Sequence, residues 1–252
     1  MKLTSFLLVA ACSASSAFAD ENLPKTLMTE RGKLLFGEDF AKPVEKSTPP
    51  APGAKKAARK AEKGSAKAAA PAPWTSGWRM AKGKWEFVDG AMRGTELKED
   101  AHGAAARYPL AYKDVVIQYD VRLDGCKQTT FSVNDAKEHV CRVLINKDGF
   151  RAQKDDHDHD DPDKAKPFNN VALPLAPGTW HTVLIEIKGG EMVATIDGKS
   201  STGTDPLIAT DKANFGFTVA GDGASFRNLR VWEARANPAW EQNKKLISAV
   251  AK

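Results

Sequence analysis

Residues 154–164 read K-D-D-H-D-H-D-D-P-D-K, so two histidines lie two positions apart inside a run of aspartates. In an extended segment His157 and His159 would share one face, a spacing that suits two imidazole ligands of a metal ion. Asp155 and Asp158 are the carboxylates that we assign to such a site. Calcium would prefer the carboxylates, whereas zinc or manganese would require the histidines. The run therefore predicts a divalent-metal site as one of three alternatives.

The other two alternatives for this run need no metal. Closely spaced aspartates repel one another and stay hydrated, and Pro162 is typical of a loop, which together favour a solvated loop. Residues 150–154 lead into the run as a strand would, which places the run at the end of a sheet. There Lys154, His157 or Asp158 would contact a bound ligand directly. The residues leave all three alternatives open.

A second set of polar residues alternates along the segment D-V-V-I-Q-Y-D-V-R-L at positions 114–123. Gln118, Asp120 and Arg122 share one face of the predicted strand. An aspartate there could act as a general base, and an arginine could hold a hydroxyl pair or an oxyanion. The apolar face comprises Val115, Ile117, Tyr119, Val121 and Leu123. The alternative is a solvated outer face with one charge pair.

His139 begins another strand-like segment, H-V-C-R-V-L-I. Alternation places His139 on one face with Cys141, and Arg142 on the other. We take His139, together with Asp120, as a catalytic acid or base, and Arg142 as a substrate-binding residue. The alternative for His139 is a half-buried structural histidine at a sheet edge, and for His181 we favour a structural role.

Short strand-like segments separated by turn residues dominate the chain from Trp74 onward. Asp89 with Gly90 and Asp197 with Gly198 are hairpin-turn signals. The expected strands are residues 84–88, 114–123, 129–133, 139–145, 180–188, 191–196, 214–220 and 225–233. Many short strands at close intervals predict an all-β antiparallel sandwich over residues 74–235. Asn237 and Pro238 are suited to begin a short C-terminal helix over residues 237–251, with Trp240, Ile247 and Val250 in its apolar stripe.

One strand-like segment, residues 32–40, precedes a stretch that cannot form a core. Residues 41–73 contain one Val and no larger apolar residue, so we predict a disordered Ala/Lys/Pro-rich insertion. Because a sandwich often pairs its first strand with its last, we expect residues 34–40 to pair near residues 225–233. The insertion would then loop out of the domain at a small entropic cost.

The formal net charge of +5 is concentrated in one place. Residues 54–67 hold six Lys or Arg and one Glu, and the remainder of the chain is close to neutral. This distribution argues against a nucleic-acid-binding domain. A soluble tether, or contact with an anionic cell-wall polymer, accounts for the basic run.

The N-terminus predicts export. Residues 1–19 have a basic start, an apolar stretch and an A-F-A cleavage motif, which are typical of a signal peptide. A lipid anchor at Cys12 is the less favoured alternative. After cleavage Cys126 and Cys141 remain, and an oxidising compartment permits a bridge between them, which we favour narrowly over two buried thiols. No segment is long and apolar enough for a transmembrane helix.

The order of these motifs resembles the concanavalin-like jelly rolls and, more narrowly, the bacterial 3-keto-disaccharide hydrolase family. The resemblance covers residues 32–233 apart from the insertion. Its motifs are L-L-F-G-E-D-F, G-K-W-E-F-V-D-G, G-T-W-H-T-V-L-I-E-I-K-G-G and A-S-F-R-N-L-R-V-W. These motifs are mostly structural and specify a fold better than an activity.

The resemblance implies an exported, periplasmic or extracellular bacterial enzyme that acts on 3-keto-glycosides as a hydrolase or lyase. A non-catalytic glycan-binding module and a structural or adhesion domain are the alternatives. In the first two cases the partner is a carbohydrate, and the oligomeric state is left open. The chain lacks the close acid pair that an ordinary retaining glucanase of this fold would need.

Overall fold

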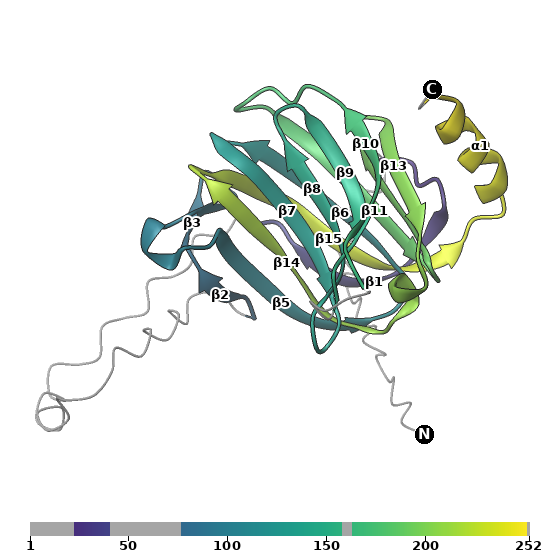
Figure 1. Ribbon diagram of the computed structural model, residues 1–252, viewed down its shortest axis with the longest axis horizontal. Coiled ribbons are helices and arrows are strands. Elements are labelled where there is room, and N and C mark those ends of the chain that lie inside the picture. Colours follow the sequence, from purple (N-terminus) through teal and green to yellow (C-terminus); the bar gives the residue numbers. More distant parts are fainter. Residues whose placement is uncertain (1–22, 41–76, 158–162, 251–252) are drawn as a thin grey trace, which may run out of the picture.

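The computed structural model describes residues 23–40, 77–157 and 163–250. Two antiparallel sheets pack face to face in a sandwich (Figure 1). Sheet A has the order β13-β12-β11-β6-β15-β4-β3, and β1 also pairs with β15. Sheet B has the order β10-β9-β8-β7-β14-β5-β2. These layers confirm the predicted all-β jelly roll with a short C-terminal helix.

The bounds of the elements follow the hydrophobic alternation of the sequence. Sheet A consists of β1 (Thr29–Glu38), β3 (Lys84–Val88), β4 (Ala91–Thr95), β6 (Val115–Leu123), β11 (Trp180–Lys188), β12 (Glu191–Ile196), β13 (Lys199–Thr204) and β15 (Ala224–Ala236). Sheet B consists of β2 (Arg79–Lys82), β5 (Ala104–Tyr112), β7 (Cys126–Asn134), β8 (His139–Asn146), β9 (Gly149–Lys154), β10 (Lys166–Ala172) and β14 (Lys212–Gly221). The helices are η2 (Lys98–Asp100), η3 (Pro206–Ala209) and α1 (Trp240–Val250).

The core lies between the inward faces of the two sheets. The predicted apolar face of β6 is buried in it, and Ile117 and Val121 have no exposed surface. Aromatic rings join the sheets: the centroids of Phe217 on β14 and Phe226 on β15 are 3.9 Å apart. Because both inward faces are apolar, alternation directs polar residues such as Ser132 and Asn134 outward.

The first strand pairs with the last one, as the sequence led us to expect. In β1, Leu34 lies opposite Trp232 and Phe36 opposite Val231, in an antiparallel register with β15. The remaining length of β15 pairs with β4 on the same side. The predicted insertion, residues 41–73, lies outside the described residues.

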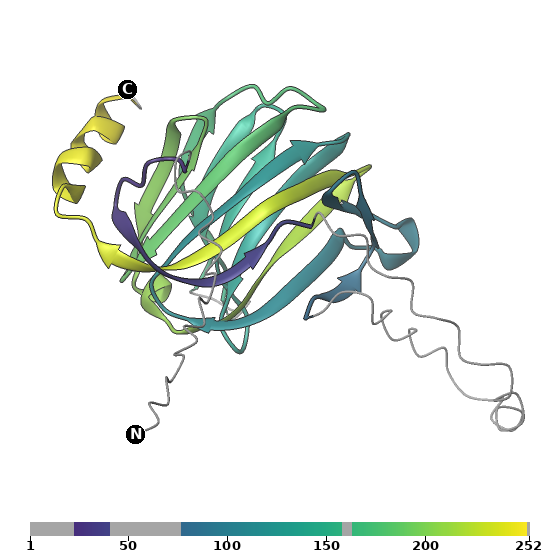
Figure 2. The ribbon, with the colours of Figure 1, turned by 180° about the vertical axis from the view of Figure 1, so that it is seen from behind.

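The outward face of sheet A is partly covered by both ends of the described chain (Figure 2). The predicted helix is present as α1, and its Trp240 and Ile247 pack with Met28 against Val193 of β12. The adjacent Leu246 is 62% exposed and takes no part in this contact. The two ends therefore act as a cover for sheet A.

The expected disulfide is absent, because Cys126 and Cys141 are free and buried. Cys141 lies opposite Val133 near one end of β7, whereas Cys126 lies at the other end. Seven residues of strand separate these positions, or about 23 Å, which a disulfide cannot span. Burial raises the pKa of the Cys126 thiol to about 11.

Candidate functional site on sheet B

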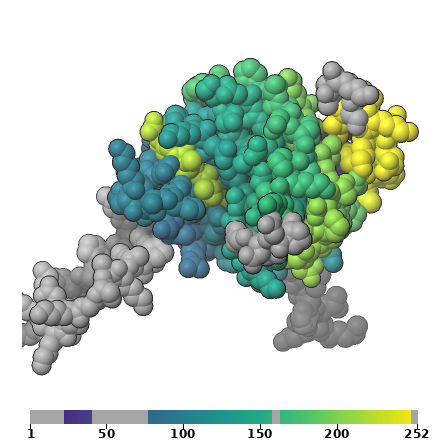
Figure 3. Space-filling view, in the orientation of Figure 1, coloured from purple at the N-terminus to yellow at the C-terminus, as the bar shows by residue number. Residues whose placement is uncertain are grey.

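The outward face of sheet B carries a row of residues that runs across five strands. One residue comes from each strand of the register β5-β14-β7-β8-β9, and we name the set the arginine row: Arg107, Gly216, Ser132, Arg142 and Gln153. The space-filling view shows this side of the molecule, with the yellow-green residues of β14 between blue and teal ones (Figure 3). Two arginines thus flank the two smallest residues of the row.

A second row lies one step along the same strands and adds amides, an imidazole and a carboxylate. Asn214 accepts a hydrogen bond from the side chain of Asn134 at 2.6 Å, and Asn134 Oδ1 lies 2.5 Å from His139 Nδ1. Asp155 follows Gln153 by two residues on the same face. We name these four residues, Asn214, Asn134, His139 and Asp155, the amide row.

The structure corrects the expected orientation of His139. Alternation placed His139 with the inward Cys141. In the structure Val133 lies opposite Cys141 and Asn134 opposite His139, so one step along β7 corresponds to two steps along β8. Val140 is consequently buried in the core, and the His139 ring turns to the side chain of Asn134. Such a bulge redirects a side chain at a strand end.

The charges of the two rows are partly desolvated. Arg142 forms an ion pair with Asp155, whose side chain is 7% exposed. Burial raises the pKa of the Asp155 carboxyl, although the Arg142 guanidinium acts in the opposite direction. Burial, together with the smaller effect of the Arg142 charge, lowers the pKa of Arg107 to about 10. Perturbed groups of this kind, gathered on one face, are typical of a binding or catalytic site.

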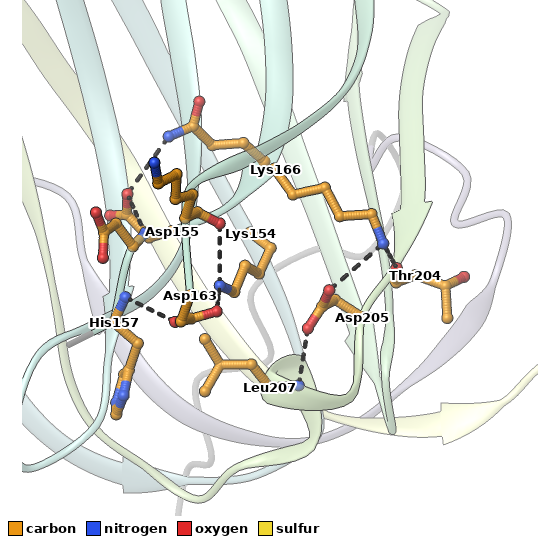
Figure 4. A network of polar contacts seen from close by, with 11 residues as sticks. Lys154, Asp155, His157, Asp163, Lys166, Thr204, Asp205 and Leu207 are labelled. Carbon is orange, nitrogen blue, oxygen red and sulfur yellow. Dashed lines mark hydrogen bonds and ion pairs between the residues drawn. The ribbon is translucent and has the colours of Figure 1, made fainter. Parts of the chain in front are cut away.

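The part of the acidic run that the structure describes lies at the end of this face. Lys154 is 3% exposed and forms an ion pair with Asp163, which also accepts a hydrogen bond from the backbone N–H of His157 (Figure 4). His157 Nε2 lies 2.7 Å from Asp135 Oδ2. Lys154 thus organises the loop and is directed away from both rows.

Two of the four predicted metal ligands are residues that the structure does not describe. Asp158 and His159 lie outside the described residues. Of the other two predicted ligands, Asp155 pairs with Arg142 and His157 with Asp135. Within the described ranges no three His, Cys, Asp or Glu side chains gather as a metal site would require.

The polar residues predicted on β6 lie on the outward face of sheet A. Gln118 is 8% exposed and accepts a hydrogen bond from Arg31 of β1 at 3.2 Å. Asp120 accepts from Thr182 at 2.8 Å, and also from Arg227 and Asn228. The Asp120 carboxylate already accepts hydrogen bonds from three protein donors, which is typical of a structural role.

Arg122 belongs to the same network on sheet A. Its Nε donates to Asp124 at 2.7 Å, and its guanidinium lies 4.9 Å from the centroid of the Trp180 ring. Arg227 lies over the same ring at 4.1 Å. Cations already lie over this aromatic ring, which would otherwise be a platform for a sugar.

The sequence-predicted residues are therefore divided between opposite faces of the sandwich. Asp120 is on sheet A and His139 on sheet B, so they cannot act on the same bond. The structure does bring together His139, Arg142 and Asp155. Arg107 and Gly216 were missed, since β5 and β14 meet only in the tertiary structure, although the polar alternation of N-F-G-F-T was a usable signal.

A separate groove of about 550 Å³ lies between α1 and strands β10 and β13. It is lined by Asn169, Ser200, Asn243, Leu246 and seven other residues. Two of its amides already have partners: Asn169 donates to the backbone of Ser200, and Asn243 to that of Leu27. We therefore assign the functional site to the two rows on sheet B, where the charged groups lie, and not to this groove.

Similar solved structures support the two-sheet sandwich described above. No family model matches the chain, and no curated protein matches its sequence. Among solved structures, a protein of unknown function with a galectin-like fold from Bacillus subtilis is similar, with a TM-score of 0.53 at 11% identity, covering 83% of this chain and 100% of that one. The chain has a jelly-roll fold.

A second similar structure is the carbohydrate-binding module CBM66 from Bacillus subtilis. Its TM-score is 0.51 at 15% identity, over 63% of this chain and 96% of that one. At such identities the similarity establishes the shared fold alone. No helix in the described ranges is long and apolar enough to cross a membrane.

Proposed function

We propose that the protein binds a saccharide on the outward face of sheet B, through the arginine row and the amide row. One observation carries the proposal: Ser132, Asn134, Gln153 and Asp155 point outward from the sheet and yet are each less than 9% exposed. Outward polar groups on an ordinary solvated face would be hydrated. Here they lie beneath longer neighbours and are held in place, as a preorganised binding surface requires.

The chemistry of the rows suits sugar hydroxyls. Guanidinium groups and amide N–H groups donate, while the carboxylate, the amide oxygens and the imidazole accept. The similarity to a structure described as a carbohydrate-binding module supports the same assignment. The predicted signal peptide, which lies outside the described residues, would place this activity in the periplasm or outside the cell.

Titration calorimetry with a panel of oligosaccharides tests the proposal. Arg142→Gln and Gln153→Ala should each weaken binding about tenfold, because each removes hydrogen bonds to the ligand. Arg122→Gln, on the opposite face, is the matched control and should bind as the unchanged protein does. If Arg122→Gln abolishes binding while Arg142→Gln does not, the site is on sheet A and the proposal fails.

A second candidate function is the hydrolysis or elimination of 3-keto-glycosides, to which the family resemblance points. The observation that favours it is the common location of His139, Arg142 and Asp155. His139 could take a proton beside a carbonyl, and the nearby Arg142 could stabilise the oxyanion that forms. Asp120 has no part in this scheme, because it lies on the other sheet.

Turnover of a 3-keto-glucoside distinguishes the two functions. An enzyme should lose turnover in His139→Ala with its unfolding midpoint unchanged, whereas a binding module should show no turnover at all. Metal analysis of the purified protein belongs to the same experiment. A stoichiometric divalent ion, with turnover lost on chelation, would assign the acidic run, including Asp158 and His159, to the site.

A further inference from the structure

The arginine row has an unusual profile across the sheet. From β5 to β8 it reads Arg107, Gly216, Ser132, Arg142, so two cations flank a floor that has almost no side chains. The two Cα atoms of the arginines are separated by three strand spacings, about 14 Å. The charge of Arg142 acts on Arg107 across this interval.

Gly216 is what allows Arg107 to lie across the floor. A Cβ atom at Gly216 would come within 2.7 Å of Cδ of Arg107. The stem of Arg107 therefore rests on the backbone of β14, and Nη1 donates to the carbonyl oxygen of Phe217 at 3.2 Å. Its other hydrogen bond, to the carbonyl of Ala106, also uses Nη1. Within the described residues Nε and Nη2 are thus available to a ligand.

The balance of charge around the floor is positive. Asp155 already pairs with Arg142, and no carboxylate of the described residues lies within ion-pair distance of Arg107. Glu138 acts on Arg107 only from farther away. Arg151, which donates to Gln153, adds a third cation on the same face. A half-buried guanidinium without a counter-ion gains most from an anionic ligand.

Neither row contains Phe, Tyr or Trp, so the large aromatic platform on which a neutral sugar ring stacks is missing from them. The aromatic ring beside the polar network of sheet A, Trp180, lies on the opposite face, under Arg122 and Arg227. Recognition on sheet B must depend on charge and hydrogen bonds. This is the pattern of an acidic-ligand site, because the planar guanidinium matches a carboxylate or sulfate.

We propose that the arginine row binds the anionic group of an acidic saccharide, seated over Ser132, between Arg142 and the guanidinium of Arg107, whose stem covers Gly216. The inference rests on the proposed function and names its substrate class. The shared chemistry is a negatively charged oxygen group, which a uronate supplies as a carboxylate and a sulfated sugar as a sulfate.

The test compares an oligogalacturonate, a sulfated oligosaccharide and a neutral oligosaccharide of equal length by calorimetry. At least one acidic ligand should bind about tenfold or more tightly than the neutral one, and this preference should decrease as salt is added. Which acidic ligand binds distinguishes carboxylate from sulfate.

Variants of Arg107 complete the experiment. Arg107→Gln should remove the acidic preference, and Arg107→Lys should restore only part of it, because Lys keeps the charge and loses the planar fork. Arg93→Gln on sheet A is the control for an equal change in net charge. Unfolding midpoints verify that each variant is folded.

The results distinguish a failure of the acidic-ligand inference from a failure of the proposed saccharide binding. Equal affinity for acidic and neutral ligands, or a preference that survives in Arg107→Gln, overturns the inference and leaves saccharide binding intact. Absence of binding to all three ligands, together with the earlier panel, overturns both.

Discussion

The Glu186 side chain is 0% exposed, and protein hydrogen-bond donors take the place of water around its carboxylate. It accepts hydrogen bonds from the backbone N–H groups of Leu27, Met28 and Thr29, at 2.7 to 2.8 Å, and from the hydroxyl of Thr29. A buried charge is tolerated when donors surround it in this way. One side chain of β11 thereby fixes the segment that leads into β1.

Replacement of Glu186 by Gln should lower the free energy of unfolding by about 3 kcal/mol, because the amide NH₂ would face backbone donors that it cannot pair with. Urea unfolding measures the change, and hydrogen exchange should show faster opening at residues 27–29. Glu233→Gln is the control, since Glu233 is exposed on β15. Equal stabilities of the two variants would contradict the role given to Glu186.

At the scale of elements, α1 is attached to sheet A by one acidic residue as well as by packing. Glu191 at the start of β12 accepts from the indole N–H of Trp240 at 2.9 Å and forms an ion pair with Lys244. Burial alone would raise the pKa of Glu191, but the hydrogen bonds from Lys244 and Trp240 outweigh it and lower the pKa. The charged form of Glu191 is therefore the one that holds the helix.

This direction sets the pH dependence of helix docking. A lowered pKa means that the stabilisation is present above the unfolded value of about 4.3 and is lost as the pH falls through the folded value. The Trp240 indole N–H resonance in NMR spectra should shift in that acidic range. Glu191→Gln should abolish this dependence, whereas Glu241→Gln, at an exposed position of α1, should retain it. An unchanged titration in Glu191→Gln would refute the assignment.

At the scale of the whole molecule, the two faces of the sandwich have different tasks. Sheet A is covered by residues 23–31 and α1, and sheet B carries the arginine row and the amide row (Figures 1 and 2). A change on one face therefore need not affect the other, because the apolar core lies between them.

A chain that ends at Ala236 tests this separation. Loss of α1 exposes Met28 and Val193 and removes the buried Trp240. The free energy of unfolding should therefore fall by about 3–5 kcal/mol. Saccharide binding, measured at a temperature where the truncated protein is folded, should stay the same. A folded truncated protein that no longer binds would show that the site extends to sheet A.

The sequence by itself determined the type of fold and most of its strands. The period-two alternation of residues 114–123 and the turn at Asp197 are local properties, and they correctly predicted β6 and the turn that ends β12, whereas β13 after that turn was not among the expected strands. Even the pairing of β1 with β15 followed from a general rule of sandwich topology. Such features depend on backbone hydrogen bonding and hydrophobic periodicity, which each segment carries in its own residues.

Only the tertiary structure decided which polar residues meet. Asp120 and His139 each lay on a plausible strand, yet the two sheets set them on opposite faces. Arg107 and Arg142 are 35 positions apart in the sequence, and they share a face only because β14 and β7 insert between β5 and β8. The register between β7 and β8 also sets the distance between Cys126 and Cys141. These relations arise from strand order and sheet packing, which no single segment encodes.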